Sequence, residues 1–241
     1  RLEPALDLLA RIDIEAPLNV FDLGCGAGAV TRIIAERWPS ANVTGVDASA
    51  QMLERAEETE ITGIKWHPAD IAEWSPASPA DLIFSNAALH WLDGHDGLFA
   101  RLAGYLNPGG VLAVQMPRNF DQPSHTCMAL AARSGPWRDK LEDVLRPNPV
   151  ASPQAYEEIL GPLVDSLDVW EEVYEHLFEG ANPVVEWIKG TSLRPLLEAL
   201  KGDERQAFHD AYAALVAKAY PKRPDGRTPY PMRRLFIVAV R

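Results

Sequence analysis

The sequence has little of several residue types that would point to other kinds of protein. Its 241 residues include only two cysteines, Cys25 and Cys127, which leaves no disulfide framework or thiolate metal cluster and is typical of a reducing cytoplasm. No apolar run approaches the roughly 18–20 residues that a membrane span needs. Lysine and arginine (23) are outnumbered by aspartate and glutamate (34), for a net charge of −11, which argues against non-specific nucleic-acid binding. We expect a cytoplasmic protein without a nucleic-acid or membrane partner.

What the chain does contain is a regular alternation of strands and helices. The chain begins with Arg1 rather than Met, and residues 2–12 already have helical spacing, so we expect a short segment to precede Arg1. No signal peptide is visible in the sequence. The predicted strands are 19–23, 42–47, 64–67, 80–86 and 111–116, and the predicted helices between them are 29–38, 49–59 and 94–106. Such an alternation predicts right-handed crossovers and a doubly wound, mostly parallel sheet. In such sheets ligands bind beyond the carboxyl ends of the strands.

After residue 116 the pattern changes. We predict proline-broken helices over 122–163, a strand at 165–178, helical stretches at 183–200 and 203–220, a loop at 221–231 and a last strand at 235–240. The predicted core is therefore 1–116, with helical cap inserts at 117–163 and 180–230. Residues 164–179 and 231–241 would supply strands that complete the core sheet.

A glycine turn organises the first half of the chain. Residues 20–30 read VFDLGCGAGAV, so an apolar strand ends in Asp22 and is followed by glycines at every second position. Glycines allow close backbone approach, and a helix start offers free N–H groups, which together suit a nucleotide cofactor. The turn also satisfies the dinucleotide pattern G-x-G-x-x-A. Asp22 favours a cationic ligand instead, and the chain contains no Tyr-x-x-x-Lys.

The segments DLGCGAG, GVD, PADI and SNAALHW together resemble the class I S-adenosylmethionine-dependent methyltransferases, over about residues 18–116. The resemblance implies a seven-stranded sheet whose last strand is antiparallel, and no metal. It implies that Asp47 binds the ribose and Asp70 the adenine of S-adenosylmethionine. The cofactor-binding set that we predict comprises Asp22, Gly24, Gly26, Gly28, Asp47, Ala48, Met52, Asp70, Ile71, Asn86, Leu89, His90 and Trp91.

The methyl acceptor has to be inferred from other residues. After the strand at 80–86 the chain reads Ser85-Asn86-Ala87-Ala88, which lacks the Asn/Asp-Pro-Pro-Tyr/Phe pattern of many amino-methylating enzymes. A carboxylate is already ionised at pH 7 and needs no base, and converging arginines suit a polycarboxylate. The substrate-orienting residues that we predict, none of them an obligatory catalytic base, are Arg118, His125, Arg194, Arg233 and Arg234.

The cap segments, among them MPRNFDQPSH and RPDGRTPYPMRRLFIVAVR, resemble the trans-aconitate 2-methyltransferases over essentially the whole chain. That resemblance implies monomethyl esterification of a tricarboxylate. Met232 stands where the family often has phenylalanine. Three alternatives stay open: an enzyme for another small acid, hydroxyl or amine metabolite, a non-catalytic S-adenosylmethionine-binding module, and a nicotinamide oxidoreductase. The oligomeric state is also open, with a monomer compatible with the sequence.

Some residues have ordinary structural interpretations. His95, His176 and His209 are too dispersed for a metal site and are interpreted as surface or helix histidines. Cys25 is interpreted as a small apolar filler. Trp137, Trp170 and Trp187 are predicted to lie in the core of the cap.

Overall fold

The computed structural model describes residues 2–58 and 63–241 and divides the chain into two compact units. The first unit comprises residues 1–117, 149–172 and 234–241, and the second comprises 118–148 and 173–233. Residues 149–163, which the sequence analysis assigned to a cap insert, fall in the first unit because α7 (Pro153–Leu160) packs against α4 (His95–Gly104). The predicted helix end at residue 59 lies outside the described residues.

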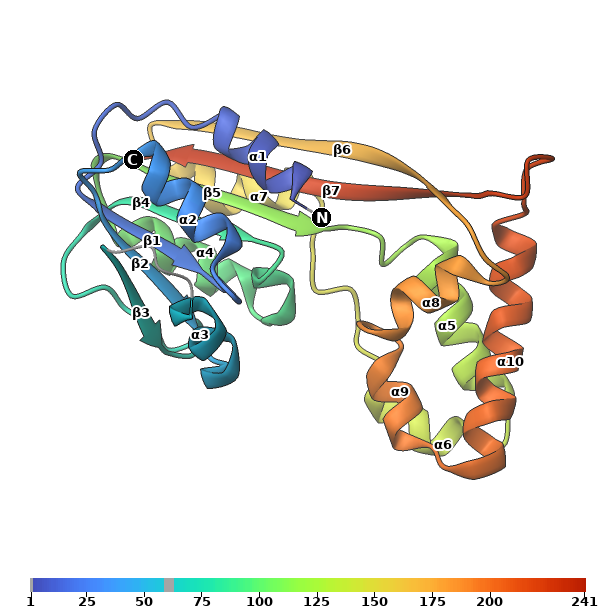
Figure 1. Ribbon diagram of the computed structural model, residues 1–241. Helices are drawn as coiled ribbons and strands as arrows, with labels where there is room; N and C mark the ends of the chain where they lie inside the picture. The colour runs from blue at the N-terminus through green and yellow to red at the C-terminus, as the bar shows by residue number, and fades with distance from the viewer. Residues whose placement is uncertain (1, 59–62) are drawn as a thin grey trace. The chain divides into compact units, whose positions relative to one another are not determined.

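A seven-stranded sheet in the order β3-β2-β1-β4-β5-β7-β6 forms the first unit (Figure 1). β1 to β5 pair in parallel and β7 runs antiparallel to β5, as predicted. The last strand begins at Thr228, within the loop predicted at 221–231, and is therefore longer than the predicted strand at 235–240. The strands are β1 (Asn19–Leu23), β2 (Asn42–Asp47), β3 (Ile64–Pro68), β4 (Ala80–Asn86), β5 (Leu106–Pro117), β6 (Ser166–Phe178) and β7 (Thr228–Val240).

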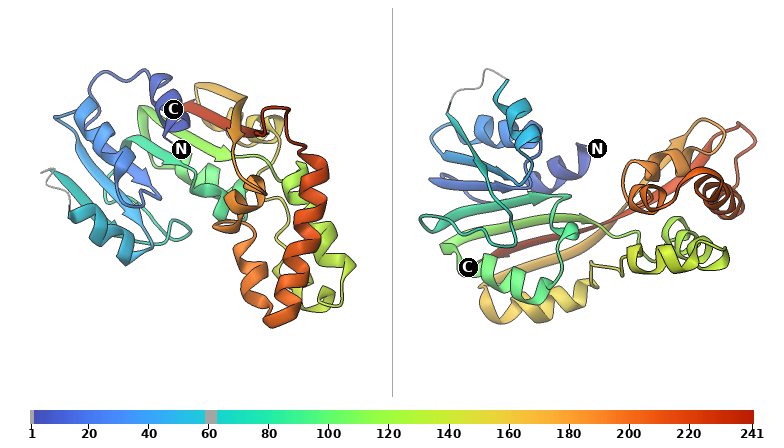
Figure 2. Two further views of the ribbon diagram at one scale, coloured as in Figure 1. Left: turned by 45° about the vertical axis from the view of Figure 1, so that its right-hand side comes forward. Right: turned by 90° about the horizontal axis from the view of Figure 1, so that it is seen from below.

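Helices cover both faces of this sheet, with α1 to α3 on one face and α4 and α7 on the other (Figure 2). α3 begins where Ser49 accepts a hydrogen bond from the Met52 amide at 3.3 Å, as the sequence predicts for a helix cap. The described helices of the unit are α1 (Glu3–Ala10), α2 (Ala29–Arg37), α3 (Ala50–Glu57), α4, α7 and the 3-10 turns η1 (Leu89–Trp91) and η3 (Gly161–Leu163).

The start of β5 differs from the prediction. The NPGG segment, expected to stop a helix before a strand at 111, lies inside β5 as a bulge, because Ala80 pairs with Leu106 while Leu82 pairs with Val111. A Cβ on Gly110 would lie 2.8 Å from the Ala80 carbonyl oxygen. The second glycine therefore lets the bulge approach β4 without losing the strand.

The second unit is helical and has its own apolar core. The Trp137 indole N–H donates to the Ala131 carbonyl at 2.9 Å within that core, and Trp187 packs against it, as predicted. Trp170 was also predicted to lie in this core, but it stacks on Phe236 of the sheet, with the ring centroids 4.9 Å apart. The described helices are α5 (Pro123–Ser134), α6 (Arg138–Leu141), η2 (Glu142–Val144), α8 (Pro183–Lys189), α9 (Arg194–Ala199) and α10 (Gly202–Ala219).

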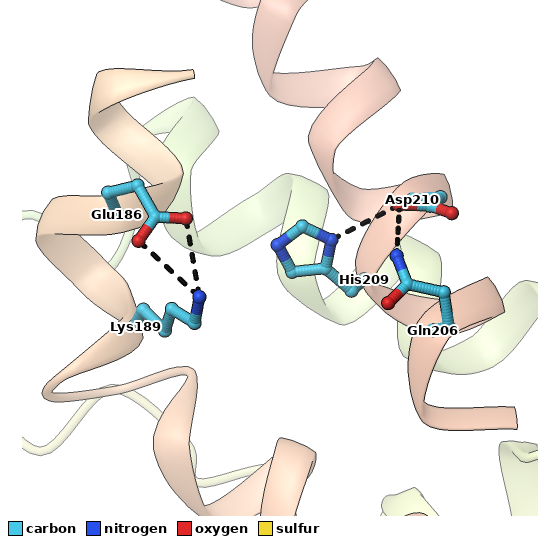
Figure 3. A network of polar contacts seen from close by, with 5 residues as sticks. All are labelled: Glu186, Lys189, Gln206, His209 and Asp210. Carbon is cyan, nitrogen blue, oxygen red and sulfur yellow. Dashed lines mark hydrogen bonds and ion pairs between the residues drawn. The ribbon is translucent and has the colours of Figure 1, made fainter. Parts of the chain in front are cut away.

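The outer faces of these helices carry solvated polar networks. In Figure 3, Gln206 and His209 both reach the Asp210 carboxylate, at 2.9 and 3.2 Å, while Lys189 faces Glu186 on α8. His209 is thus the ordinary helix histidine that was predicted. In the described parts of the chain, no helix combines the length and the apolar character needed to cross a membrane.

Candidate active site

The glycine turn between β1 and α2 is built by close packing. Gly24 and Gly28 both have φ of 76°. A Cβ on Gly24 would collide with the Ala88 side chain, and one on Gly28 would collide with the Trp66 indole. A Cβ on Gly26 would meet nothing within 4 Å. The turn is therefore closed by its neighbours at its two ends and open at its middle, where a ligand can approach the backbone.

Asp22, at the end of β1, is buried with 2% of its surface exposed. The Thr31 hydroxyl, from the first turn of α2, donates to its Oδ2 at 2.6 Å. Burial raises the pKa of Asp22 to about 7, the hydrogen bond from Thr31 opposes this, and the nearby Asp47 charge adds to it. A carboxyl group poised in this way becomes fully ionised when a cationic ligand binds beside it.

Asp47 joins the ends of β1 and β2. Its Oδ2 accepts from the Gly26 amide and its Oδ1 from the Ser49 amide, both at 2.8 Å. Each carboxylate oxygen keeps a further acceptor position. The carboxylate is thus fixed in orientation and can still receive two hydroxyl groups, such as those of a ribose.

The loop after β3 brings Asp70 and Ile71 to the same edge. Asp70 is exposed and accepts from the Ala72 amide at 2.9 Å, whereas Ile71 is buried against the glycine turn. Arg101 of α4 holds the loop by donating to the carbonyls of Ile71 and Trp74, at 2.9 and 2.6 Å. Sequence analysis missed Arg101, because nothing in the local sequence connects α4 with this loop.

The chain leaves β4 through a strained residue. Ala87 has φ of 53° and is, within residues 2–58 and 63–241, the one non-glycine residue in the left-handed region. Its amide donates to the Gln115 carbonyl at 2.9 Å. Leu89 and His90 are buried in η1, while Trp91 is 49% exposed. Backbone strain of this kind clusters at functional sites, and Ala87 follows Asn86 directly.

His95, which the sequence analysis interpreted as a surface or helix histidine, begins α4 and fixes the position of η1. It is buried, with Nδ1 2.5 Å from the Tyr156 hydroxyl and Nε2 3.1 Å from the Leu89 carbonyl. Because a carbonyl only accepts, Nε2 donates to Leu89 and Nδ1 accepts from Tyr156. Burial lowers the pKa of His95 and keeps it neutral. The ring contacts η1 and α7, which lie far apart in the sequence, so no local pattern identified it.

In the second unit, the predicted basic residues are only partly brought together. The Arg118 amide donates to the Arg233 carbonyl at 2.9 Å, so these two residues are neighbours. The Arg233 guanidinium pairs with Asp121 at 3.0 Å. Arg234 belongs to the first unit, opposite Pro117 in the β5–β7 ladder.

The two other predicted substrate-orienting residues have different surroundings from those expected. Burial lowers the pKa of His125 to about 4, and its ring lies between the Ser124 and Ser192 hydroxyls at 3.1 and 3.2 Å. It is neutral at pH 7, and both of its ring nitrogens already lie within hydrogen-bond distance of a serine hydroxyl. Arg194 forms an exposed ion pair with Glu198 at 2.7 Å.

Comparison of the sequence with known proteins shows the family to which this chain belongs. A family model described as a methyltransferase domain matches residues 20–110. The chain is 46% identical over 241 residues to the trans-aconitate 2-methyltransferase of Azoarcus sp. (strain BH72), covering 100% of this chain and 94% of that protein. It is 47% identical to the enzyme of the same name from Streptomyces coelicolor, covering 99% and 82%. This chain belongs to the trans-aconitate 2-methyltransferase family. The resemblances predicted from the sequence are confirmed.

Solved structures support the fold assignment for this trans-aconitate 2-methyltransferase family member. The YcgJ protein from Bacillus subtilis matches with a TM-score of 0.62 at 15% identity, over 99% of this chain and 97% of that one. Phosphoethanolamine N-methyltransferase 2 of Haemonchus contortus, solved with S-adenosyl-L-methionine, matches with a TM-score of 0.56 at 18% identity, over 98% and 52%. The predicted class I methyltransferase fold is therefore confirmed.

The packing of the glycine turn predicts a graded loss of stability. Gly28→Ala should destabilise the fold by about 2–4 kcal/mol, because positive φ and the Trp66 collision both oppose it. Gly26→Ala, the matched control, has the φ cost alone and should lose about 1 kcal/mol. Urea unfolding measures both, and Trp66→Leu should recover part of the Gly28→Ala loss. Equal losses for the two glycines would contradict the packing argument.

The hydrogen-bond chain at His95 gives a second prediction. Tyr156→Phe should cost about 1–3 kcal/mol, because it leaves His95 Nδ1 and the Ala151 amide, which donates to Tyr156 at 3.3 Å, without that partner. Tyr105→Phe is the control, since no hydrogen bond to the Tyr105 hydroxyl occurs in the described residues. Thermal unfolding compares the two variants. A Tyr156→Phe melting temperature equal to the control would show that the chain contributes nothing.

Proposed function

We propose that this protein transfers a methyl group from S-adenosylmethionine to a carboxylate of trans-aconitate, giving a monomethyl ester and S-adenosylhomocysteine. The observation that carries the proposal is the identity of 46–47% with enzymes of this name over essentially the full chain. The arrangement of acidic residues and glycines at the carboxyl ends of β1 to β4 agrees with it. The family membership argues against the nicotinamide oxidoreductase alternative.

The residues at this edge suit S-adenosylmethionine. Asp47 has acceptor positions for both ribose hydroxyls, the open middle of the turn at Gly26 admits the ligand, and Asp22 faces the charge of the methionine part. Asp70 and Ile71 suit the adenine amino group and ring. S-adenosylmethionine supplies an electrophilic methyl group on a positively charged sulfur. The other cofactor contacts that we propose are those of Ala48, Met52, Asn86, Leu89, His90 and Trp91.

Carboxyl methylation needs alignment more than proton transfer. A carboxylate oxygen forms the bond to the methyl carbon with its own electron pair, while the pair of the C–S bond passes to sulfur. The anion and the cation both become neutral, and no proton moves. The protein has to hold the two reactants in line and away from water. This chemistry therefore requires no general base in the active site.

The acid would be held by guanidinium groups. Arg118 and Arg233 are neighbours in the second unit, Arg233 pairs with Asp121, and the charges of both arginines lower the pKa of Asp121. We propose Arg118 as the main cation for a substrate carboxylate, with Arg233, Arg234 and His125 in supporting roles. Among the predicted substrate-orienting residues, Arg194 is the least suited to bind the acid, because its guanidinium group is already paired with Glu198 at the surface. Other small acids as substrates, a monomeric state and a cytoplasmic location stay predictions.

Arg118 gives a direct kinetic test. Arg118→Ala should raise KM for trans-aconitate about 10- to 100-fold, because a charged hydrogen-bonding partner is lost, and should leave S-adenosylmethionine affinity within about twofold. Arg133→Ala is the matched control, since Arg133 pairs with Glu142 on the exposed side of the same unit. Labelled methyl transfer to a panel of di- and tricarboxylates measures both variants. An unchanged KM, or a wild-type preference for an uncharged acceptor, would refute the proposed role.

The pKa of Asp22 near 7 predicts a pH dependence. A cationic cofactor favours the ionised carboxylate, so S-adenosylmethionine affinity should fall as pH decreases below about 7, by up to about tenfold per unit. Because the folded pKa exceeds the unfolded value of 3.8, stability of the free protein should decrease as pH rises from about 4 to about 7.

Asp22→Asn separates these effects from general acid instability. The variant should bind S-adenosylmethionine more weakly at pH 8 with a flat pH profile between 6 and 8, and should be more stable than wild type at pH 8. Calorimetry and denaturant unfolding measure the two quantities. A wild-type affinity independent of pH over that range would show that Asp22 does not face the cofactor.

A further inference from the structure

Gln115 is a buried amide that the site described so far does not use. It lies near the carboxyl end of β5 with 0% of its surface exposed. Neither Oε1 nor Nε2 has a hydrogen-bond partner among residues 2–58 and 63–241. Leaving a buried polar group unsatisfied costs about 1–3 kcal/mol. Such a group in a well-packed sheet requires an explanation, and a bound ligand is one.

The neighbours of Gln115 across the sheet are known from the strand register. It pairs with Asn86 on β4 and with Phe236 on β7, so the three side chains leave the same face of the sheet. Asn86 Oδ1 is also buried and has no partner in the described part of the chain. Phe236, stacked on Trp170, offers no hydrogen bond. The unsatisfied Gln115 amide therefore lies between the unsatisfied Asn86 Oδ1 on one strand and the Phe236 ring on the other.

This amide pair lies at the edge where the cofactor residues meet. The strained Ala87 follows Asn86 directly and donates its amide to the Gln115 backbone. The next residue, Ala88, packs on Gly24 of the glycine turn. Asn86, the last residue of β4, is thus two residues before the alanine that packs on the turn, and Gln115 lies beside it near the carboxyl end of β5. Ligands of such sheets bind at this edge.

We infer that the side-chain amide of Gln115 binds the substrate carboxylate that accepts the methyl group. The inference rests on the proposed function and assigns a division of labour within it. Guanidinium groups suit carboxylates that keep their charge. The reacting carboxylate loses its charge, and a cation bound to it would draw electron density from the attacking oxygen and would be left unpaired in the ester complex. A neutral amide N–H donates to one oxygen while the other attacks, and it can still donate to the ester carbonyl.

Gln115→Met tests the inference, because methionine has a similar volume and no polar atoms. The melting temperature should stay unchanged or rise, since an unsatisfied amide is removed. S-adenosylhomocysteine affinity by calorimetry should stay within about twofold. The kcat for trans-aconitate should fall about 10- to 100-fold with a smaller change in KM, since the other carboxylates still bind. Gln206→Met makes the same chemical change on the exposed face of α10 and should leave all three quantities unchanged.

Gln115→Glu is a second variant that tests the same contact by repulsion. Its kcat should fall further than that of Gln115→Met and recover as pH is lowered and the new carboxyl group is protonated. Normal kcat in both variants overturns the inference, and so does a loss of S-adenosylhomocysteine affinity that matches the kinetic loss. Wild-type inactivity on trans-aconitate would refute the proposed function instead, and the same variants would then be measured on whichever carboxylic acid the enzyme methylates.

Discussion

The fit of one glycine turn between two side chains constrains the rest of the first unit. Gly24 lies against Ala88 and Gly28 against Trp66, at distances that leave no room for a Cβ on either glycine. The turn after β1 is therefore packed against a side chain of β3 and against the segment that follows β4, and Asp47 connects it to β2 by accepting the Gly26 amide. Because the Trp66 ring and the Ala88 methyl group lie directly against the backbone of the turn, these contacts leave little freedom. The polar groups at this edge keep fixed positions as a result.

In the proposed reaction, a carboxylate anion and a sulfonium cation become a neutral ester and a neutral thioether. The charged and polar side chains of this protein suit that change. Asp22 is buried deeply enough for its pKa to lie near neutrality, so its ionisation responds to a cation beside it. Asp47 is held by two backbone amides and keeps acceptor positions. Two arginines that suit a polycarboxylate are the first and the last residue of the second unit, Arg118 and Arg233, whose backbones are paired. In contrast, the pair of Gln115 and Asn86 is uncharged. Under the inference drawn above, a neutral donor at the reacting carboxylate would leave no unpaired buried charge when the ester forms.

Predictions from the sequence were most accurate where a local pattern was sufficient. The predicted limits of β1, β2 and β4 agree with the structure, because each is an apolar run ended by a polar residue or turn. The Ser49 cap was also predicted correctly. The start of β5 was not, since a bulge at Gly109 and Gly110 depends on the space beside Ala80. Trp170 was assigned to the wrong unit, because its partner Phe236 is 66 residues away along the chain.

The sequence by itself determined the fold class and the family, and it predicted the residues of the cofactor edge, since these depend on periodicity, glycine spacing and acidic residues at strand ends. Only the tertiary structure decided the state and the partners of the polar side chains. It made His95 a neutral link between η1 and α7, lowered the pKa of His125 so that it carries no charge at pH 7, and left Gln115 buried without a partner. Burial and hydrogen bonding depend on which distant segments meet, and these set the chemistry of a side chain as much as its identity does.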